Sequence, residues 1–321
     1  MDMFNPTLSQ MLLMFSLILI GFLLRKKKVL PEESHVTMSK LETWVFVPAL
    51  NFGNMLKNFN AKTFSTNSTL ILYGFATIVI ALIIAQPLAA LFIRTKKRHD
   101  SELMYQRNIY RYAMTFGNYG FMGNFIIMGV WGDSMLSQYL MFTMIISIVC
   151  SSWGLYILIP KDNNVSFWKN ISKGIITPPM IALVLGMICG ITGVGRYIPL
   201  FFTNMLSNAS GCMGPVAMLL AGFVIGGFDV KKMLLNAKVY IATAIRLIIL
   251  PAIFVLVFKS FGTSKEILTF ILIAFGTPLG LNTIVYPAAY GGDTKTGASM
   301  AVISHTLCVI TIPVMYMLLI G

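Results

Sequence analysis

Two short stretches of the sequence combine amide side chains with residues that interrupt helices. GNYGFMGN at 117–124 and TPLGLN at 277–282 each lie within an apolar part of the chain. An interrupted helix presents free backbone N–H groups at the start of its second half, where the helix dipole also favours negative charge. A nearby asparagine adds N–H donors without burying a charge, so the combination is typical of a site for an organic anion. The residues that we predict to bind this anion are Asn118, Gly120, Pro278, Gly280, Asn282 and Thr283.

Two ionisable side chains, Arg246 and His305, lie inside other apolar parts of the chain. Arg246 is a candidate counter-ion or gate for the bound anion, and His305 has a ring that could titrate during proton coupling. Each also has a structural interpretation, since Arg246 could cap a carbonyl group and His305 could pack between helices. The same holds for the two asparagines, whose amides could satisfy backbone groups that glycine and proline release.

The composition is that of a membrane protein, because 57% of the 321 residues are hydrophobic and 11% are charged. Eight uncharged runs exceed the roughly 20 residues that span the hydrocarbon core of a bilayer. Two further segments, one of them interrupted by Arg246, complete a prediction of ten spans. The ten segments are 3–24, 43–56, 63–93, 112–132, 134–160, 174–195, 197–228, 239–258, 267–292 and 296–321.

Basic residues are distributed unevenly between the predicted loops. The first span is followed by RKKK at 25–28, and most of the 24 Lys and Arg residues lie in loops on the same side. Short basic loops are retained in the cytoplasm, so we predict a multi-pass protein of the cell membrane with both termini outside. Topology and anionic lipid account for the net charge of +13, and no nucleic-acid partner is predicted.

Several features of the first half of the chain recur in the second half. The pairs are Gly21 with Gly186, Pro48 with Pro215, Pro87 with Pro251 and Gly120 with Gly280, at separations of 160 to 167 residues. They predict two five-span repeats, residues 1–160 and 161–321. Because five is odd, the second repeat is inverted in the membrane, as in many secondary transporters. The predicted fold is an all-α polytopic membrane protein in which helices 4 and 9 are broken.

With the repeat and both interruptions located, the chain resembles the auxin efflux carrier family, and within it the bacterial malate permease branch. The resemblance extends over essentially all 321 residues. It rests on FGNYGFMGN at 116–124, TPPMIALVLG at 177–186, TPLGLNTIVYPAAYGGD at 277–293 and ASMAVISHTLCVITIP at 298–313.

This resemblance implies an architecture and a mechanism. Helices 4 and 9 are expected to cross, helices 1, 2, 6 and 7 to form a scaffold domain, and helices 3–5 and 8–10 to form a transport domain. An elevator-type movement and a homodimer are implied as well. The carboxylate-binding amides of the family correspond to Asn118 and Asn282. The crossover proline corresponds to Pro278 only, because this chain has GNF at 123–125 where the family usually has a proline.

The leading functional hypothesis is a secondary active transporter of small organic anions, with malate or a related di- or tricarboxylate as its substrate. A carrier of auxin-like aromatic monocarboxylates is a close alternative, and coupling to H⁺, Na⁺ or a counter-substrate stays open. A cation/proton antiporter would need carboxylates deep in the membrane, whereas Glu42 is interpreted as a solvated residue at a helix start. A membrane-embedded enzyme would need a nucleophile with its base, or a metal site. Three scattered histidines and four cysteines without ligand spacing indicate neither, so no catalytic residue, cofactor or metal is predicted.

Overall fold

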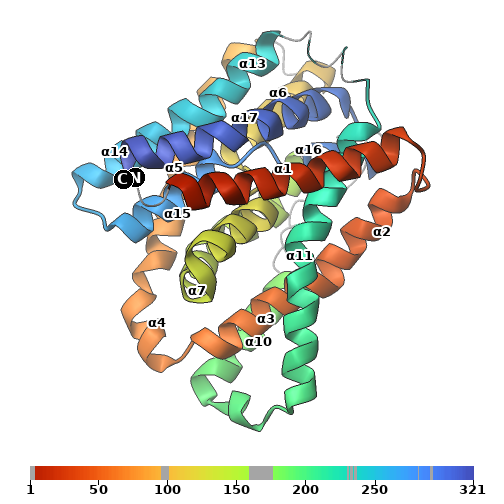
Figure 1. Ribbon diagram of the computed structural model, residues 1–321. Helices are drawn as coiled ribbons and strands as arrows, with labels where there is room; N and C mark the ends of the chain where they lie inside the picture. The colour runs from red at the N-terminus through yellow and green to blue at the C-terminus, as the bar shows by residue number, and fades with distance from the viewer. Residues whose placement is uncertain are drawn as a thin grey trace.

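The computed structural model describes residues 4–94, 101–158, 176–229, 231, 234, 237–280, 282–289 and 292–321. Within these ranges the chain is almost entirely helical and forms no strand (Figure 1). The predicted boundary between the two repeats, at residues 160 and 161, lies outside the described residues. The N- and C-terminal ends of the described chain lie beside one another (Figure 1).

The helices of the first half are α1 (Phe4–Lys26), α2 (Ser34–Leu41), α3 (Val47–Asn58), α4 (Ala61–Asn67), α5 (Thr69–Phe92), α6 (Ser101–Thr115), α7 (Asn124–Val149) and α8 (Leu155–Leu158). Those of the second half are α10 (Pro178–Thr192), α11 (Leu200–Gly226), α13 (Ala237–Ala244), α14 (Leu250–Ser260), α15 (Lys265–Gly276), α16 (Asn282–Ala289) and α17 (Lys295–Leu319). Wider π-helical turns occupy η1 (Glu42–Phe46), η2 (Tyr119–Gly123), η3 (Cys150–Gly154) and η5 (Ile245–Ile249), and η4 (Val194–Tyr197) is a 3₁₀ turn.

Six helical stretches of the described chain are long and apolar enough to cross a membrane, judged by length and composition. They are Phe4–Lys26, Thr69–Phe92, Tyr119–Leu158, Leu200–Gly226, Ala237–Ser260 and Lys295–Leu319. The longest stretch contains Gly132, whose φ of 82° is not helical and marks a kink. It therefore comprises two segments, and they meet near residue 133, where the sequence predicts the boundary between the spans 112–132 and 134–160. The other predicted spans are present as helices that are shorter or interrupted, as α10 and α15–α16 illustrate. The all-α, multi-pass character of the fold is therefore confirmed.

Glu42 differs from the expectation of a solvated helix start. Helical structure begins at Ser34, because the charged segment SHVTMSKL contains no glycine or proline and folds as α2, continuous with η1. Glu42 is therefore inside a helix, and its side chain is fully buried. Neither carboxylate oxygen has a hydrogen-bond partner among the described residues. The expectation for this residue was wrong.

Glycines allow α1 and α11 to approach until their backbones touch. The Cβ of an alanine at Gly222 would collide with the carbonyl oxygen of Ile18, and one at Gly21 would collide with the carbonyl oxygen of Leu219. In a lipid environment such close contacts supply the packing energy that the hydrophobic effect does not provide between helices. The two helices therefore form a rigid pair.

A second rigid pair is formed by α3 and α10, which lie together near α11 (Figure 1). Gly186 rests on Phe52, with 2.8 Å between the carbonyl oxygen of Phe52 and the position of a Cβ. Gly190 rests in the same way on the carbonyl oxygens of Met55 and Phe59. Since α11 also packs against α3, these four helices make one closely packed unit.

Gly222→Ala should lower the free energy of unfolding by about 1–3 kcal/mol, the usual cost of forcing extra atoms into a packed interface. The new methyl group would meet the backbone of Ile18. Thermal unfolding of the purified protein in detergent measures the effect. Gly211→Ala in the same helix is the matched control, because no atom lies within 4 Å of its Cβ position. Equal stability of the two variants would contradict the close contact.

Candidate functional site

The two interrupted helices meet at one point. Helix α6 ends at Thr115 and α15 ends at Gly276, and the residues that follow form a single antiparallel bridge between Gly117 and Leu279. The backbone N–H of Asn118 donates to the carbonyl oxygen of Pro278 at 2.8 Å. Pro278 has no N–H to donate within α15, and its carbonyl oxygen accepts this bond from the other interruption. Both interruptions therefore lie where the sequence predicts them, and they are in direct contact.

Gly117 is the residue that makes this contact sterically possible. A Cβ at Gly117 would lie 2.6 Å from Nη2 of Arg246 and 2.7 Å from Oγ1 of Thr277, closer than real Cβ atoms come. At Gly120, by contrast, no atom of the described residues lies within 4 Å of the Cβ position, so the space beside it is open in this part of the structure. At Gly280 the nearest atom, the carbonyl oxygen of Gly117, is 3.5 Å away. Sequence reasoning did not single out Gly117 as a site residue, although it opens the quoted stretch.

Asn118 has a fixed backbone and a free amide. Its carbonyl oxygen accepts from the N–H groups of Met122 and Gly123, at 3.0 Å each. Its side chain is buried, and Nδ2 has no hydrogen-bond partner among the described residues. An unpartnered buried amide N–H is costly in folding, so the group is available to a ligand or to water.

Asn282 begins the half-helix α16 and is only partly buried. Its Nδ2 donates to Oη of Tyr112 at 2.7 Å, and that hydroxyl lies 3.0 Å from Sγ of Cys150. The tyrosine therefore fixes the amide, which carries two N–H donors in total. Tyr112 and Cys150 come from α6 and η3, and no sequence signal marks either residue beyond its place in an apolar run.

Hydroxyl groups hold the second interruption in place. Thr283 is fully buried and donates from Oγ1 to the carbonyl oxygen of Gly280 at 3.0 Å. The N–H of Leu279 donates to Oγ of Ser304 on α17 at 3.1 Å. Gly297 lets α17 approach closely, because a Cβ there would contact the backbone of Thr283. Of these, the sequence indicated Thr283 and Gly280 as binding residues, whereas the structure gives the Thr283 hydroxyl a bond within its own turn.

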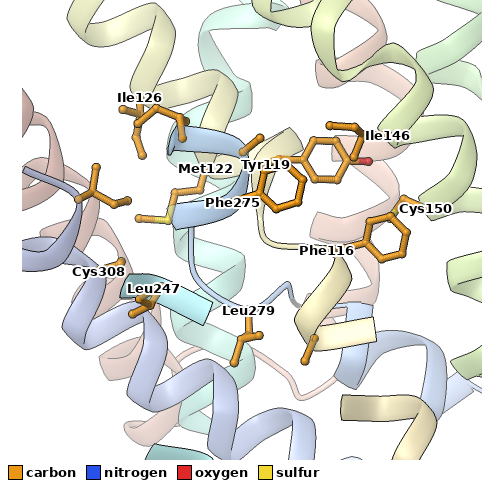
Figure 2. Packing of buried hydrophobic residues seen from close by; sticks show 14 of the residues in the cluster. Phe116, Tyr119, Met122, Ile126, Ile146, Cys150, Leu247, Phe275, Leu279 and Cys308 are labelled. Carbon is orange, nitrogen blue, oxygen red and sulfur yellow. The ribbon is translucent and has the colours of Figure 1, made fainter. Parts of the chain in front are cut away.

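Apolar side chains enclose the crossing point. Figure 2 shows Phe116, Tyr119, Phe275 and Leu279 around the interrupted segments, and all four are buried. Phe116 also packs on the ring of Trp153, with centroids 6.1 Å apart. Apolar side chains around a site lower the local dielectric constant, which strengthens every hydrogen bond to a charged group within it.

Of the two ionisable candidates, Arg246 lies at the crossing and His305 bonds to its own helix. Arg246 is fully buried, and its Nη2 donates to the carbonyl oxygen of Ala274 at 3.2 Å. Its guanidinium carbon lies 5.3 Å from the centre of the Phe275 ring. His305 is buried with Nδ1 2.8 Å from the carbonyl oxygen of Ala301, and Nε2 has no partner among the described residues.

Two cavities flank the crossing helices. The first, of about 490 Å³, is lined by residues that include Arg25, His35 and Lys40, and also by Ile284, the second residue after Asn282. Neither Asn118 nor Asn282 is among its described lining residues. The first cavity therefore has basic residues in its lining and approaches the start of α16.

The second cavity, of about 520 Å³, lies between α3, α11 and α7. Lys57 and Asp133 line it and form an ion pair at 2.9 Å. Nδ2 of Asn54, on the same helix as Lys57, donates to the carbonyl oxygen of Asp133 at 3.0 Å. Met128 of α7 also lines this cavity, so it lies beside the half-helix that follows Asn118.

Comparison with known proteins agrees with this geometry at the level of the family. The family described as membrane transport protein matches residues 6–316, nearly the whole chain. YfdV, an uncharacterized transporter of Escherichia coli strain K12, is 24% identical over 204 residues, which cover 60% of this chain and 62% of that protein. YfdV of Escherichia coli O157:H7 and of Shigella flexneri match to the same extent. The matched family is that of the auxin efflux carriers, so the resemblance to this family is confirmed, whereas the malate permease branch stays a prediction.

Asn118→Leu should raise the free energy of unfolding by about 1–3 kcal/mol, because it removes a buried donor that has no partner. Thermal unfolding in the absence of any carboxylate is the measurement. Asn51→Leu is the matched control, since Nδ2 of Asn51 donates to the carbonyl oxygen of Pro179 at 2.9 Å and its loss should destabilise the protein. A comparable loss of stability in both variants would assign Asn118 a purely structural role.

Proposed function

The chain belongs to the membrane transport protein family, and from this premise we propose that it is a secondary active transporter of small organic anions. Malate or a related di- or tricarboxylate is the proposed substrate, carried across the cell membrane. The observation that carries the proposal is the contact between the two interrupted helices, with the free amide of Asn118 and the tyrosine-held amide of Asn282 beside it.

The start of each half-helix supplies the chemistry for binding a carboxylate. The turn η2 begins at Tyr119 and α16 begins at Asn282, and the first N–H groups of a helix have no partner within it. These groups and the partial positive charge of the helix start favour an anion. Hydrogen bonds to an ionised carboxylate are stronger than neutral ones, especially where water is excluded. Two helix starts at one crossing offer a donor group for each end of a dicarboxylate.

The proposed architecture has ten membrane-spanning helices in two inverted five-helix repeats. The hydrogen bond between Asn118 and Pro278 supports it, because these residues are 160 positions apart, the same separation as Gly120 and Gly280. A local two-fold axis would relate equivalent residues at such a contact. The adjacent chain ends in Figure 1 fit an even number of spans, with both termini proposed to lie outside.

The scaffold and transport domains are also a proposal. Helices α1, α3, α10 and α11 correspond to spans 1, 2, 6 and 7, and glycine contacts join them into a closely packed unit that suits a fixed scaffold. The crossing helices would belong to the moving transport domain. From the family resemblance we also propose that two copies associate as a homodimer.

An elevator-type movement is supported by the positions of the two cavities. Each is lined on one side by proposed scaffold helices and on the other by a half-helix, α16 at the first cavity and α7 at the second. Sliding the crossing helices along the scaffold would bring the amides alternately toward the two cavities. Arg25 and Lys40 are in the lining of the first cavity, which supports the proposal that this cavity is the cytoplasmic one, where their charge would attract anions.

The alternatives differ in what they require of the site. A carrier of aromatic monocarboxylates would use the same amides and is the nearest variant. A cation/proton antiporter would need an exchanging carboxylate, and the buried Glu42 lies in η1, which packs against α11, α10 and its own neighbouring helices. That position, within the proposed scaffold, does not favour exchange at the crossing.

The test of the proposed function is uptake of radiolabelled carboxylates by proteoliposomes that contain the purified protein. Malate, citrate, oxalate, pyruvate and indole acetate would be compared under imposed pH and sodium gradients. Saturable malate uptake that other dicarboxylates inhibit is the expected result. Uptake of none of these anions, in protein that is shown to be folded, would contradict the proposal.

Asn282→Ala should weaken malate binding about tenfold to a hundredfold, because a hydrogen bond to a charged group contributes about 1.5–3 kcal/mol. Tyr112→Phe is the matched control, since it removes the partner of the amide and keeps the amide itself. Tyr112→Phe should weaken malate binding less than Asn282→Ala does. Uptake kinetics or calorimetric titration would measure both variants.

Asn282→Asp should abolish uptake near neutral pH, because it keeps the shape of the side chain and sets a negative charge against the substrate. Uptake should return only in acid, where the new carboxyl group is protonated. The pH profile of uptake, compared with that of the unmodified protein, is the measurement. Ordinary uptake at neutral pH by a folded Asn282→Asp protein would remove this residue from the site.

A further inference from the structure

Arg246 lies where the first halves of both interrupted helices end. Its Nη2 donates to the carbonyl oxygen of Ala274 in the last turn of α15. The same nitrogen lies against Gly117, two residues after the end of α6, at 2.6 Å from the position of a Cβ there. The last carbonyl groups of a helix lack partners within it and carry a partial negative charge. The guanidinium group therefore bonds to the C-terminal end of α15 and lies close to the chain that follows the end of α6.

Among the described helices that pack against its turn, Arg246 has no carboxylate nearby to balance its charge. The described helices packed against its turn are α13, α14, α15 and α17, and the acidic residue among them is Glu266. Glu266 is in the first turn of α15, about 12 Å along the helix from Ala274 at 1.5 Å per residue. The balancing groups at hand are the helix ends and the face of the Phe275 ring.

We propose that Arg246 is a built-in cation that takes the place of a coupling sodium ion at the crossing, so that transport does not require Na⁺. In secondary transporters, unwound carbonyl groups and the C-terminal ends of half-helices coordinate coupling cations. Here a covalently attached cation already bonds to the carbonyl oxygen of Ala274 at one such helix end. The inference rests on the proposed function, and it assigns Arg246 to the helix ends instead of to the substrate.

This assignment separates the two sides of the crossing by charge. The starts of the second halves, with Asn118 and Asn282, form the positive side that is proposed to bind the anion. The ends of the first halves form the negative side, which Arg246 occupies. Removing the guanidinium group would leave a space beside the carbonyl oxygen of Ala274 and the unwound chain at Gly117, which suits a small monovalent cation.

The experiment compares the unmodified protein, Arg246→Met and Arg246→Lys in proteoliposomes, with Na⁺ replaced by N-methylglucamine. Uptake by the unmodified protein should be unchanged by this replacement. Arg246→Met should lose about tenfold or more of its uptake without Na⁺, as expected when a hydrogen bond to a charged group is removed. Added Na⁺ or guanidinium ion should restore it. Arg246→Lys should retain uptake without Na⁺, because it keeps the charge.

Two results would overturn the inference. One is a requirement for Na⁺ in the unmodified protein. The other is a loss in Arg246→Met that no cation restores and that is far larger for dicarboxylates than for monocarboxylates. That pattern would mean that Nε and Nη1, which have no partner among the described residues, bind the second carboxylate of the substrate.

Unfolding of the purified proteins gives a readout that does not depend on transport. Na⁺ or guanidinium should raise the unfolding temperature of Arg246→Met and leave the unmodified protein unchanged. Arg196→Met is the matched control, because Arg196 also lies over an aromatic ring, 5.8 Å from the centre of Tyr197, but is exposed. If no carboxylate is transported while this stabilisation is observed, the proposed function fails, and what stands is the assignment of Arg246 as a built-in cation at the helix ends. If the cations do not stabilise Arg246→Met, that role is wrong.

Discussion

A helix that stops inside a membrane leaves backbone groups without partners, and lipid offers none. Each such group costs several kcal/mol in hydrocarbon, so an interruption is stable only where another part of the protein satisfies it. Here two interruptions satisfy each other, through the bond from Asn118 to Pro278. Ser304 pairs with Leu279, and Arg246 pairs with Ala274. The remaining architecture serves to hold these two segments together.

The neighbouring packing follows from this constraint. A crossing at this distance needs Gly117, because a side chain there would displace Arg246 or Thr277. It also needs α17 close behind the second interruption, which Gly297 permits. Outside the crossing, α1 packs closely on α11 and α3 packs closely on α10 through glycines. A site with free donors can persist under these conditions, because the surrounding contacts offset the cost of leaving an amide such as that of Asn118 unpartnered.

Local sequence patterns predicted much of this fold, because the features concerned are local. Long uncharged runs predicted the apolar helices, and glycine with proline predicted both interruptions, since these residues act on the backbone next to them. The family followed from the same stretches. The burial of Glu42 was not predicted from the sequence, because it depends on where the helix begins and on the packing of α11 against η1.

The hydrogen-bond partners within the site could not be predicted from the sequence either. Tyr112 meets Asn282 across 170 residues, and Arg246 meets Ala274 across 28. Such pairs depend on how helices are arranged, which one sequence does not specify. The repeat pattern indicated Gly120 and not Gly117 as a site residue, although among the described residues a Cβ is excluded at Gly117 and has open space at Gly120. Steric requirements of this kind become visible only when the two interruptions are placed in contact.

The central claim is that the open space beside the crossing holds a carboxylate. Gly120→Cys tests it, because no atom lies within 4 Å of the new Cβ and the thiol would project into that space. The partly or fully exposed Cys189 and Cys212 would be replaced by serine, whereas Cys150 and Cys308 are buried. The measurement is the rate of maleimide labelling at position 120 with increasing malate. The account predicts that malate slows labelling in a saturable way and that its uncharged diamide does not. A labelling rate unchanged by malate, citrate, oxalate, pyruvate and indole acetate would contradict the account.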